Sequence, residues 1–246
     1  MTLFISDLHL EASRPGIGRQ FLAFLQEEAV SAEALYILGD LFESWIGDDD
    51  PNPHYAEMKR GIRTVADAGV PVFFMHGNRD FLIGAEFAEE TGVELLEDPC
   101  KVHLYGEDVL LSHGDALCID DVKYQEMRTV TRNPGWQKMM LKKPLAERQA
   151  IARQARADSM AHGGSLDPQI SDVNQSAVEQ LLRQHGVRTL LHGHTHRPAV
   201  HRFLLDGAPA TRIVLGDWYE QGSAVRWDKA GPKLGAAATR RPVAER

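Results

Sequence analysis

Five short apolar runs in this 246-residue chain each end in a cluster of polar residues, and this arrangement constrains the fold most. The runs are short and lie between turn-forming residues, which predicts buried strands rather than helices. The predicted strands are Thr2–Ser6, Ala34–Leu38, Pro71–Met75, Val109–Ser112 and Val187–Leu191. Because ligands of α/β sheets gather beyond the carboxyl ends of strands, the five clusters are expected to meet in one place.

The clusters supply oxygen and nitrogen donors of the kind that bind divalent metal ions. In an extended chain, residues separated by one position point to the same side, so Asp7 and His9 can reach one ion. The same spacing separates two histidines of the last cluster. The predicted metal ligands are Asp7, His9, Asp40, Asn78, His113, His194 and His196, with Asp40 bridging two ions. A pair of ions can clamp a phosphoryl group during in-line displacement.

Other residues near the clusters have simpler explanations. Glycines such as Gly77 allow tight turns, whether or not a phosphate approaches the backbone. Asp80 and Asp115 are predicted to orient ligands or stabilise turns rather than bind metal. His192 is predicted to be structural, with a role as ligand or orienting group as the alternative. The three successive aspartates Asp48–Asp50 predict a solvated loop.

The order of helices and strands predicts two sheets. Helices are expected between the early strands, whereas predicted strands at Val93–Leu96, Lys101–Tyr105 and Val109–Ser112 follow one another directly. This mixture favours two sheets packed face to face over one doubly wound sheet. We therefore predict a four-layer α/β/β/α sandwich, a single domain over residues 1–228. Residues 229–246 show no periodic apolar face and are expected to be a flexible tail.

Residues 122–165 depart from this plan and are predicted to form a helical cap insertion. They carry no strand signal, and apolar residues such as Met127, Val130 and Met140 recur at helical spacing. Between Lys123 and Arg156 there are nine basic and two acidic residues, a local net charge of +7 in a chain whose net charge is −8. The predicted cap therefore concentrates positive charge between two of the polar clusters.

Composition excludes several classes of protein. The chain is 43% hydrophobic and 25% charged, as in ordinary globular proteins, and its acidic net charge argues against general nucleic-acid binding. Cys100 and Cys118 are too few for a disulfide framework, and the first residues lack the pattern of a signal peptide, so we expect a cytoplasmic protein. No apolar run approaches the roughly 18 residues of a spanning helix, so any membrane contact is expected to be peripheral.

The polar clusters resemble the motifs of calcineurin-like metallophosphoesterases. Longer strings are similar to the UDP-2,3-diacylglucosamine pyrophosphatases, hydrolases of lipid A biosynthesis. The similar strings are Gly39–Glu43, Trp45–Asp49, Gly77–Gly84, Asp172–Gln175, His192–Pro198 and Gly216–Trp218. The resemblance runs from about residue 2 to about residue 228.

This resemblance implies hydrolysis of UDP-2,3-diacylglucosamine to UMP and 2,3-diacylglucosamine 1-phosphate (lipid X), with two divalent ions, usually Mn²⁺. It implies that the seven predicted ligands bind the metals and that Asp40, Asn78, Arg79 and His113 are catalytic. The implied substrate contacts are Asn78, Arg79, Asp121, Tyr124, Ser159 and His194. The family pattern has asparagine and lysine where this chain has Gly163 and Leu166.

A diacylated substrate implies a peripheral protein at the cytoplasmic face of the inner membrane, with no nucleic-acid partner and protein partners unknown. Acyl chains need an apolar groove, and an anionic bilayer attracts a basic patch by about 1 kcal/mol per nearby lysine or arginine. Met139, Met140 and Leu141 either line such a groove or pack the cap onto the sandwich.

Arg79 indicates which kind of leaving group the site can release. Most metallophosphoesterases have Gly-Asn-His where this chain has Gly77-Asn78-Arg79, and their histidine is thought to protonate a poor leaving group. Arginine cannot transfer a proton near neutral pH, but it can bind phosphate through two bonds. A phosphate monoester, whose second pKa is about 6, can leave with little protonation. We therefore predict a pyrophosphate-bond substrate.

Two other functions are compatible with the motifs. One is a soluble phosphohydrolase of dinucleoside polyphosphates or cyclic nucleotides, against which the basic apolar cap and Arg79 argue. The other is a non-catalytic scaffold, which would be expected to lack some metal ligands, whereas none of the seven predicted donors is missing here.

Overall fold

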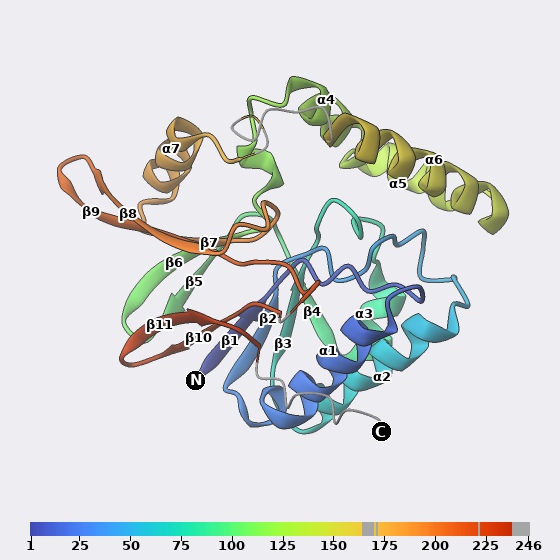
Figure 1. Ribbon diagram of the computed structural model, residues 1–246, viewed down its shortest axis with the longest axis horizontal. Helices are drawn as coiled ribbons and strands as arrows, with labels where there is room; N and C mark the ends of the chain where they lie inside the picture. The colour runs from blue at the N-terminus through green and yellow to red at the C-terminus, as the bar shows by residue number, and fades with distance from the viewer. Residues whose placement is uncertain (164–169, 171, 221, 238–246) are drawn as a thin grey trace.

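Two β-sheets form the centre of the computed structural model, which describes residues 1–163, 170, 172–220 and 222–237 (Figure 1). The first sheet has the order β11-β10-β1-β2-β3-β4 and the second β5-β6-β7-β9-β8. The strands of the first are β1 (Thr2–Ile5), β2 (Ala34–Ile37), β3 (Val72–Met75), β4 (Val93–Leu96), β10 (Ala224–Asp228) and β11 (Gly231–Gly235). Those of the second are β5 (Cys100–Leu104), β6 (Glu107–Ser112), β7 (Thr189–His192), β8 (Ala199–Leu205) and β9 (Ala208–Val214).

Helices cover the outer face of each sheet, and a further group of helices lies apart from them. The first sheet is covered by α1 (Pro15–Glu27), α2 (Pro53–Asp67) and α3 (Ala85–Thr91), and the second by α7 (Gln175–His185). The separate group consists of α4 (Val122–Thr131), α5 (Pro134–Leu141) and α6 (Leu145–Gly163), seen together at the top right of Figure 1. Short 3-10 turns occur at Ala29–Ser31 and Asp115–Leu117.

Three groups of buried apolar side chains join the layers. Leu111 and Trp227 belong to the group between the two sheets. Phe24 of α1 and Ile62 of α2 pack on the outer face of the first sheet, and Leu182 of α7 packs on the second. Burial of apolar surface is the main stabilising contribution in such layers. The predicted four-layer α/β/β/α sandwich is confirmed.

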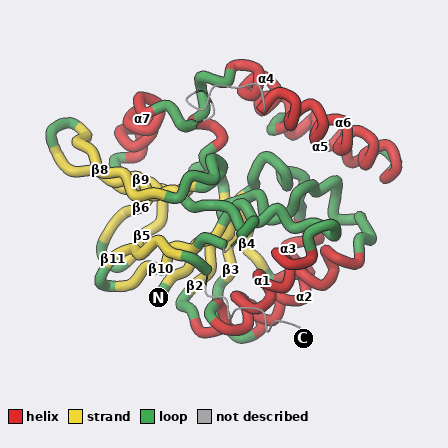
Figure 2. The backbone as a smooth tube through the Cα atoms, in the orientation of Figure 1, coloured by secondary structure: helices red, strands yellow, loops and turns green. Residues whose placement is uncertain are grey.

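Strand direction brings the polar clusters together. Strands β1 to β4 are parallel to their sequence neighbours, and β6, β7 and β9 are parallel in the second sheet. Parallel strands end at the same edge, so the loops that follow them gather between the sheets and α4–α6, as the green segments of Figure 2 show. The five predicted clusters all lie in these loops or at their start.

The prediction of a flexible tail over residues 229–246 is wrong for its first part, and residues 238–246 lie outside the described residues. The expected flexible tail includes β11, which pairs antiparallel with β10 over five residue pairs from Ala224–Gly235 to Asp228–Gly231. The segment has few apolar residues, so the sequence pattern did not indicate a strand. At the edge of a sheet, backbone hydrogen bonds to one neighbouring strand are enough to form it. Helix α1 begins at Pro15, because proline suits the first turn, although Gly16 and Gly18 weaken the helical pattern there.

The prediction that Asp48–Asp50 form only a solvated loop is also wrong. The Asp48 carboxylate accepts hydrogen bonds from Trp45 Nε1 (2.9 Å) and from the backbone of Phe87 (3.0 Å) at the start of α3. Asp49 pairs with Arg148 of α6, which also donates to the carbonyl of Ile46. This loop therefore joins the cap to the sandwich.

The second attachment of the cap is Asp115, which is fully buried. It accepts hydrogen bonds from Tyr124 Oη (2.7 Å) and Arg128 Nε (2.9 Å). Arg132 lies 3.5 Å from the same carboxylate and donates to the carbonyl of Gly77. These contacts of Asp115 attach the cap, whereas the sequence predicted that Asp115 orients ligands or stabilises turns. Among the described helices, α4–α6 included, none is long and apolar enough to cross a bilayer.

Replacing Asp115 by alanine is expected to lower the free energy of unfolding by about 3 kcal/mol, because Arg128 and Tyr124 would lose a buried partner. Urea unfolding followed by circular dichroism measures this. Asp67→Ala, which removes an exposed pair with Arg63, should cost about 0.5 kcal/mol or less and serves as control. Equal effects would contradict a role of Asp115 in attaching the cap.

Candidate metal centre

One set of donors lies where β1 and β7 end. Asp7, His9 and His196 each offer an atom within 4.8 Å of the others. His9 Nε2 is 3.1 Å from His196 Nε2, and the latter is 3.4 Å from Asp7 Oδ1. Asp7 is fully buried and His9 nearly so. The structure therefore brings together three predicted ligands that are almost 190 positions apart in the sequence, at 7, 9 and 196.

A second set lies beside it, after β2, β6 and β7. Asp40, His113 and His194 also offer atoms within 4.8 Å of one another. Asn78 joins them, because its Oδ1 is 3.0 Å from His113 Nε2 and 2.9 Å from His194 Nδ1. All seven predicted ligands thus belong to one of two adjoining sets.

Asp40 lies between the two sets. Its Oδ2 is 3.8 Å from His9 Nε2 of the first set, and its Oδ1 is 3.7 Å from His113 Nε2 of the second. Each carboxylate oxygen therefore faces a different set, so this carboxylate can bridge two ions.

The donors are compatible with two divalent cations. Neighbouring ligand atoms of one six-coordinate ion with bonds of about 2.1 Å lie about 3 Å apart. The distances between the ring nitrogens of His9 and His196, and from Asn78 Oδ1 to the ring nitrogens of the second set, are close to this value. Asp7 Oδ1 is buried and accepts no hydrogen bond from the described part of the chain. Carboxylate, amide and imidazole donors suit a first-row divalent metal.

Five of the seven donors have left-handed backbone conformations, which residues other than glycine seldom adopt. The φ angles are 56° at Asp7, 50° at His9, 52° at Asp40, 68° at His194 and 55° at His196. Such conformations cluster at functional sites, where surrounding contacts hold them. The turns redirect each side chain toward the common centre immediately after its strand.

Gly77 and Asp80 hold the loop that carries Asp40. A Cβ atom at Gly77 would lie 2.1 Å from Asp40 Oδ1, so only glycine allows this approach. The buried Asp80 carboxylate accepts hydrogen bonds from the backbone of Gly77 (2.8 Å) and Leu41 (2.7 Å). Burial and the charge of Asp40 raise the pKa of Asp80 to about 6. The predicted turn-stabilising role of Asp80 is confirmed.

An oxygen atom lies close to one ring nitrogen of three of the imidazoles, and in His113 this contact is a hydrogen bond. His9 Nδ1 is 3.0 Å from Glu43 Oε2, His113 Nδ1 is 2.9 Å from the carbonyl of Leu38, and His196 Nδ1 is 3.5 Å from Asp217 Oδ2. Such acceptors fix which nitrogen faces a metal. Glu43 and Asp217 stand in strings that carried the family resemblance, but no role was predicted for either residue from the sequence. His192 is buried and belongs to neither set.

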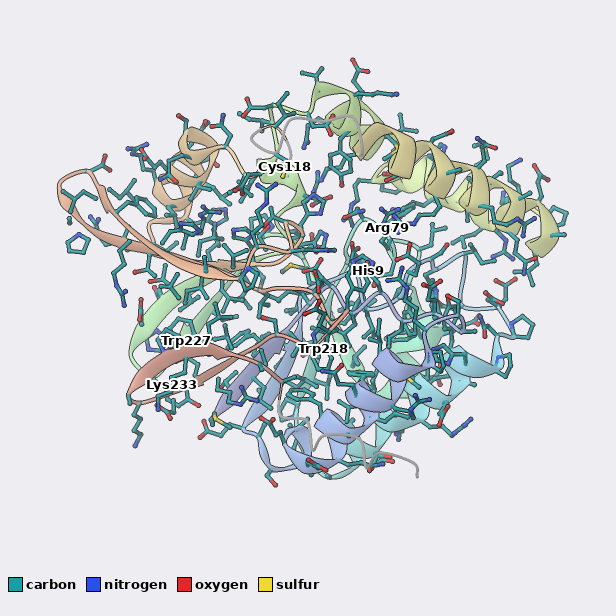
Figure 3. All side chains as sticks on the ribbon, viewed as in Figure 1. His9, Arg79, Cys118, Trp218, Trp227 and Lys233 are labelled. Carbon is teal, nitrogen blue, oxygen red and sulfur yellow. The ribbon has the colours of Figure 1, made fainter. Side chains whose placement is uncertain are left out.

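The substrate-contact residues implied by the resemblance lie on the side of the second set. Arg79 donates to Ser159 of α6 (3.2 Å), and the Tyr124 ring is 5.7 Å from that of His194. Asp121 accepts from the backbone of Tyr124 at the start of α4. Figure 3 shows Arg79 between the cap helices and His9. Gly163 is the last residue of α6, and Leu166 lies outside the described residues.

A cavity of about 300 Å³ opens beside Arg79 and Asn78, between the sandwich and the cap. Its lining is mostly apolar and includes Trp45, Met140 and Ala152. Met140 is buried, whereas Met139 and Leu141 are 53% and 43% exposed. Of the three residues considered for a groove, Met140 therefore lines the cavity, and it also packs with the core of the sandwich.

Without metal, nearby carboxylates favour protonation of two histidines of the site, His113 and His196; burial lowers the pKa of His196, but its contact with Asp7 outweighs this and raises the pKa. Burial lowers the pKa of His113, but Asp40, Asp115 and Asp7 outweigh it and raise the pKa to about 9. Burial and the nearby His113 lower the pKa of His194 to about 4. The carboxylates of the site thus stabilise a positive charge beside them, while His194 stays neutral and can donate its lone pair to a metal.

Metal affinity is expected to rise with pH between 6 and 8. Below a pKa of about 9 His113 is protonated, so a cation must displace a proton, and affinity should increase by up to about tenfold per pH unit. Calorimetric titration with Mn²⁺ at several pH values measures this. His103→Gln, at an exposed histidine paired with Asp108, should leave the slope unchanged. A pH-independent affinity would contradict proton displacement.

Comparison with known proteins agrees with this geometry. The sequence profile of the calcineurin-like phosphoesterases matches residues 1–198. The UDP-2,3-diacylglucosamine hydrolase of Aeromonas hydrophila is 54% identical over 224 residues, 91% of this chain and 93% of the relative. The enzyme of that name from Stenotrophomonas maltophilia is 50% identical over 244 residues, 96% of this chain and 98% of the relative. The chain belongs to the calcineurin-like phosphoesterase family and, within it, to the family of the UDP-2,3-diacylglucosamine hydrolases.

Proposed function

We propose that this protein hydrolyses the pyrophosphate bond of UDP-2,3-diacylglucosamine to give UMP and 2,3-diacylglucosamine 1-phosphate. Relatives named for hydrolysis of this substrate match nearly the whole chain. The observation that carries the proposal is a pair of donor sets that share Asp40 and adjoin an apolar cavity. The first feature supports phosphoryl chemistry and the second a lipid substrate.

The two metals would be held by residues of both sets. Asp7, His9 and His196 would hold one ion and Asn78, His113 and His194 the other, with Asp40 shared. Mn²⁺ is the proposed metal, because the family resemblance implies it and the carboxylate and amide oxygen donors suit it. When bound, two divalent cations supply a nucleophilic water near neutral pH and neutralise charge on the phosphates. We propose Asp40, Asn78, Arg79 and His113 as the catalytic residues.

Arg79 is suited to bind the departing phosphate. Its Nε is buried and has no hydrogen-bond partner among the described residues, while its NH2 group donates to Ser159. A phosphate oxygen in the adjoining cavity could accept from Nε, a charge-assisted hydrogen bond. Because arginine keeps its proton, this interaction favours a leaving group that is stable as an anion.

Replacing Arg79 by alanine should lower kcat/KM for the lipid substrate by about 100-fold, the usual effect of losing a charge-assisted contact to the reacting phosphate. Arg79→His should recover little, since protonation is not what the leaving group needs. Steady-state kinetics measure both. Arg153→Ala, at an exposed arginine of α6, is the control. Full activity of Arg79→Ala would rule out the proposed role.

The cavity between cap and sandwich is suited to acyl chains. The lining combines residues of the sandwich, such as Trp45 and Leu82, with residues of α5 and α6. An apolar chain placed there leaves water, whereas a nucleotide or a small polar diester gains nothing from it. We therefore propose that the lipid half of the substrate lies under the cap.

Filling this cavity should impair lipid turnover selectively. Ala152→Phe adds a ring at a lining position and is expected to lower kcat/KM for the lipid substrate at least about tenfold, with a smaller loss for bis(p-nitrophenyl) phosphate. Ala150→Phe, at an exposed position of the same helix that does not line the cavity, is the matched control. Equal losses for both substrates would contradict an acyl-chain site.

The outer face of the cap supports peripheral membrane association. Val122 of α4 and Met139 and Leu141 of α5 are large apolar side chains that are at least 43% exposed and do not line the cavity under the cap. Lys123 and other exposed cations lie on the same helices. Apolar side chains among basic ones are typical of surfaces that bind anionic bilayers. We propose that this face meets the cytoplasmic leaflet of the inner membrane.

Direct assay tests the proposed function. With Mn²⁺ supplied, the protein should convert UDP-2,3-diacylglucosamine to UMP faster than it hydrolyses dinucleoside polyphosphates or cyclic nucleotides. Asp40→Asn should lose at least about 10³-fold in kcat, because it removes the charge shared by both sets. Mass spectrometry of the products and metal analysis of the variant measure this. Turnover that persists after the metal ions are removed by a chelator would contradict the proposal.

A further inference from the structure

The two halves of the proposed substrate must leave the metal centre in different directions. The groups suited to the lipid half, Arg79, Tyr124 and Ser159, all lie beside the second donor set, under the cap. A pyrophosphate that spans both sets then places its other half beyond the first set.

Tyr219 and Arg14 lie beyond the first set. The Tyr219 ring is stacked on that of His9, with centroids 5.9 Å apart, and is 6.0 Å from that of His196. The Arg14 guanidinium carbon is 4.7 Å from the Tyr219 ring centroid. Tyr219 is 40% exposed. An aromatic ring and a planar cation are therefore presented to solvent directly beside two proposed metal ligands.

There is room for a ligand on both sides of Tyr219. A hollow of about 490 Å³ lies between Tyr219 and His196, lined also by Asp217 and Glu220. A second, of about 680 Å³, runs from Tyr219 along α1 past Arg14. Tyr219 and Glu220 line both. Together they form a path from the first donor set to the N-terminal end of α1.

We propose that Arg14 and Tyr219 form the binding site for the nucleoside monophosphate half of the substrate, an inference that rests on the proposed function. The phosphate would lie at the metals, and the uracil would stack on the planar Arg14 guanidinium or on the Tyr219 ring, as bases do in sequence-tolerant sites. The carboxylates of Asp217 and Glu220 line the same path and are suited to accept from ribose hydroxyls.

The nearby acidic residues do not oppose this assignment. Glu11 pairs with Arg14, and Glu43 pairs with Arg156 and His9. Uracil and ribose are neutral, so only the phosphate would be repelled, and it would lie at the cations.

UMP binding to the Mn²⁺-loaded protein tests the proposal. Calorimetry should show binding about tenfold weaker in Arg14→Ala and in Tyr219→Leu, while Tyr219→Phe binds like wild type. Arg14→Lys keeps the charge without the plane and should bind more weakly than wild type. Inorganic phosphate should bind equally to all of these proteins, because it contacts only the metals. Arg60→Ala, at an exposed arginine of α2, is the control.

Two results would overturn the subsite: unchanged UMP binding in Arg14→Ala, or a parallel loss of phosphate binding in Arg14→Ala and Tyr219→Leu, which would place the effect at the metals. If the wild-type protein hydrolyses the lipid substrate but the substitutions at Arg14 and Tyr219 leave UMP binding unchanged, only the proposed subsite is wrong. If UMP binding responds as expected but the lipid substrate is not hydrolysed, the proposed function fails instead.

Discussion

The structure depends on placing buried carboxylates and imidazoles within a few ångströms of one another. Asp7, Asp40 and His113 are at most 2% exposed, so water cannot stabilise their charges. Isolated buried charges are very unfavourable, and a partner of opposite sign is needed. In the metal-free protein His113 supplies part of that charge by holding a proton. The surrounding loops and backbone donors keep the acidic groups together in either state.

The backbone bears much of this constraint. Left-handed conformations at non-glycine residues cost of order 1 kcal/mol or more each, and five metal-ligand candidates adopt them. Hydrogen bonds compensate locally: Asp7 accepts from Ser6 Oγ and from the backbone of His194, which joins the end of β1 to the end of β7. The two sheets are thus joined at the donor sets as well as through the apolar core between them.

Much of the site could be predicted because strand direction is encoded locally. A short apolar run followed by Asp-x-His places those side chains at a sheet edge, and the family resemblance adds the order of the clusters. Contacts between segments that are distant in the sequence were harder to predict. The pairing of Glu43 with His9 and Arg156, and of Asp49 with Arg148, depends on how the cap packs, which no local pattern specifies. The edge strand β11 was missed because backbone pairing leaves little trace in side-chain composition.

The cations of the cap include a group paired with the sandwich and a group exposed to solvent. Arg128, Arg132, Arg148 and Arg156 pair with groups of the sandwich, whereas Lys123, Lys138, Lys142 and Arg153 are exposed. The net charge counted along the sequence therefore overstates the field at the outer face, since Asp115, Asp49 and Glu43 offset much of the charge of the four paired arginines. Attraction to an anionic surface would come mainly from hydrated ammonium groups on flexible stems, which ionic strength screens readily. Adhesion through this face would accordingly be weak and reversible, and the exposed apolar side chains would decide how long the molecule stays.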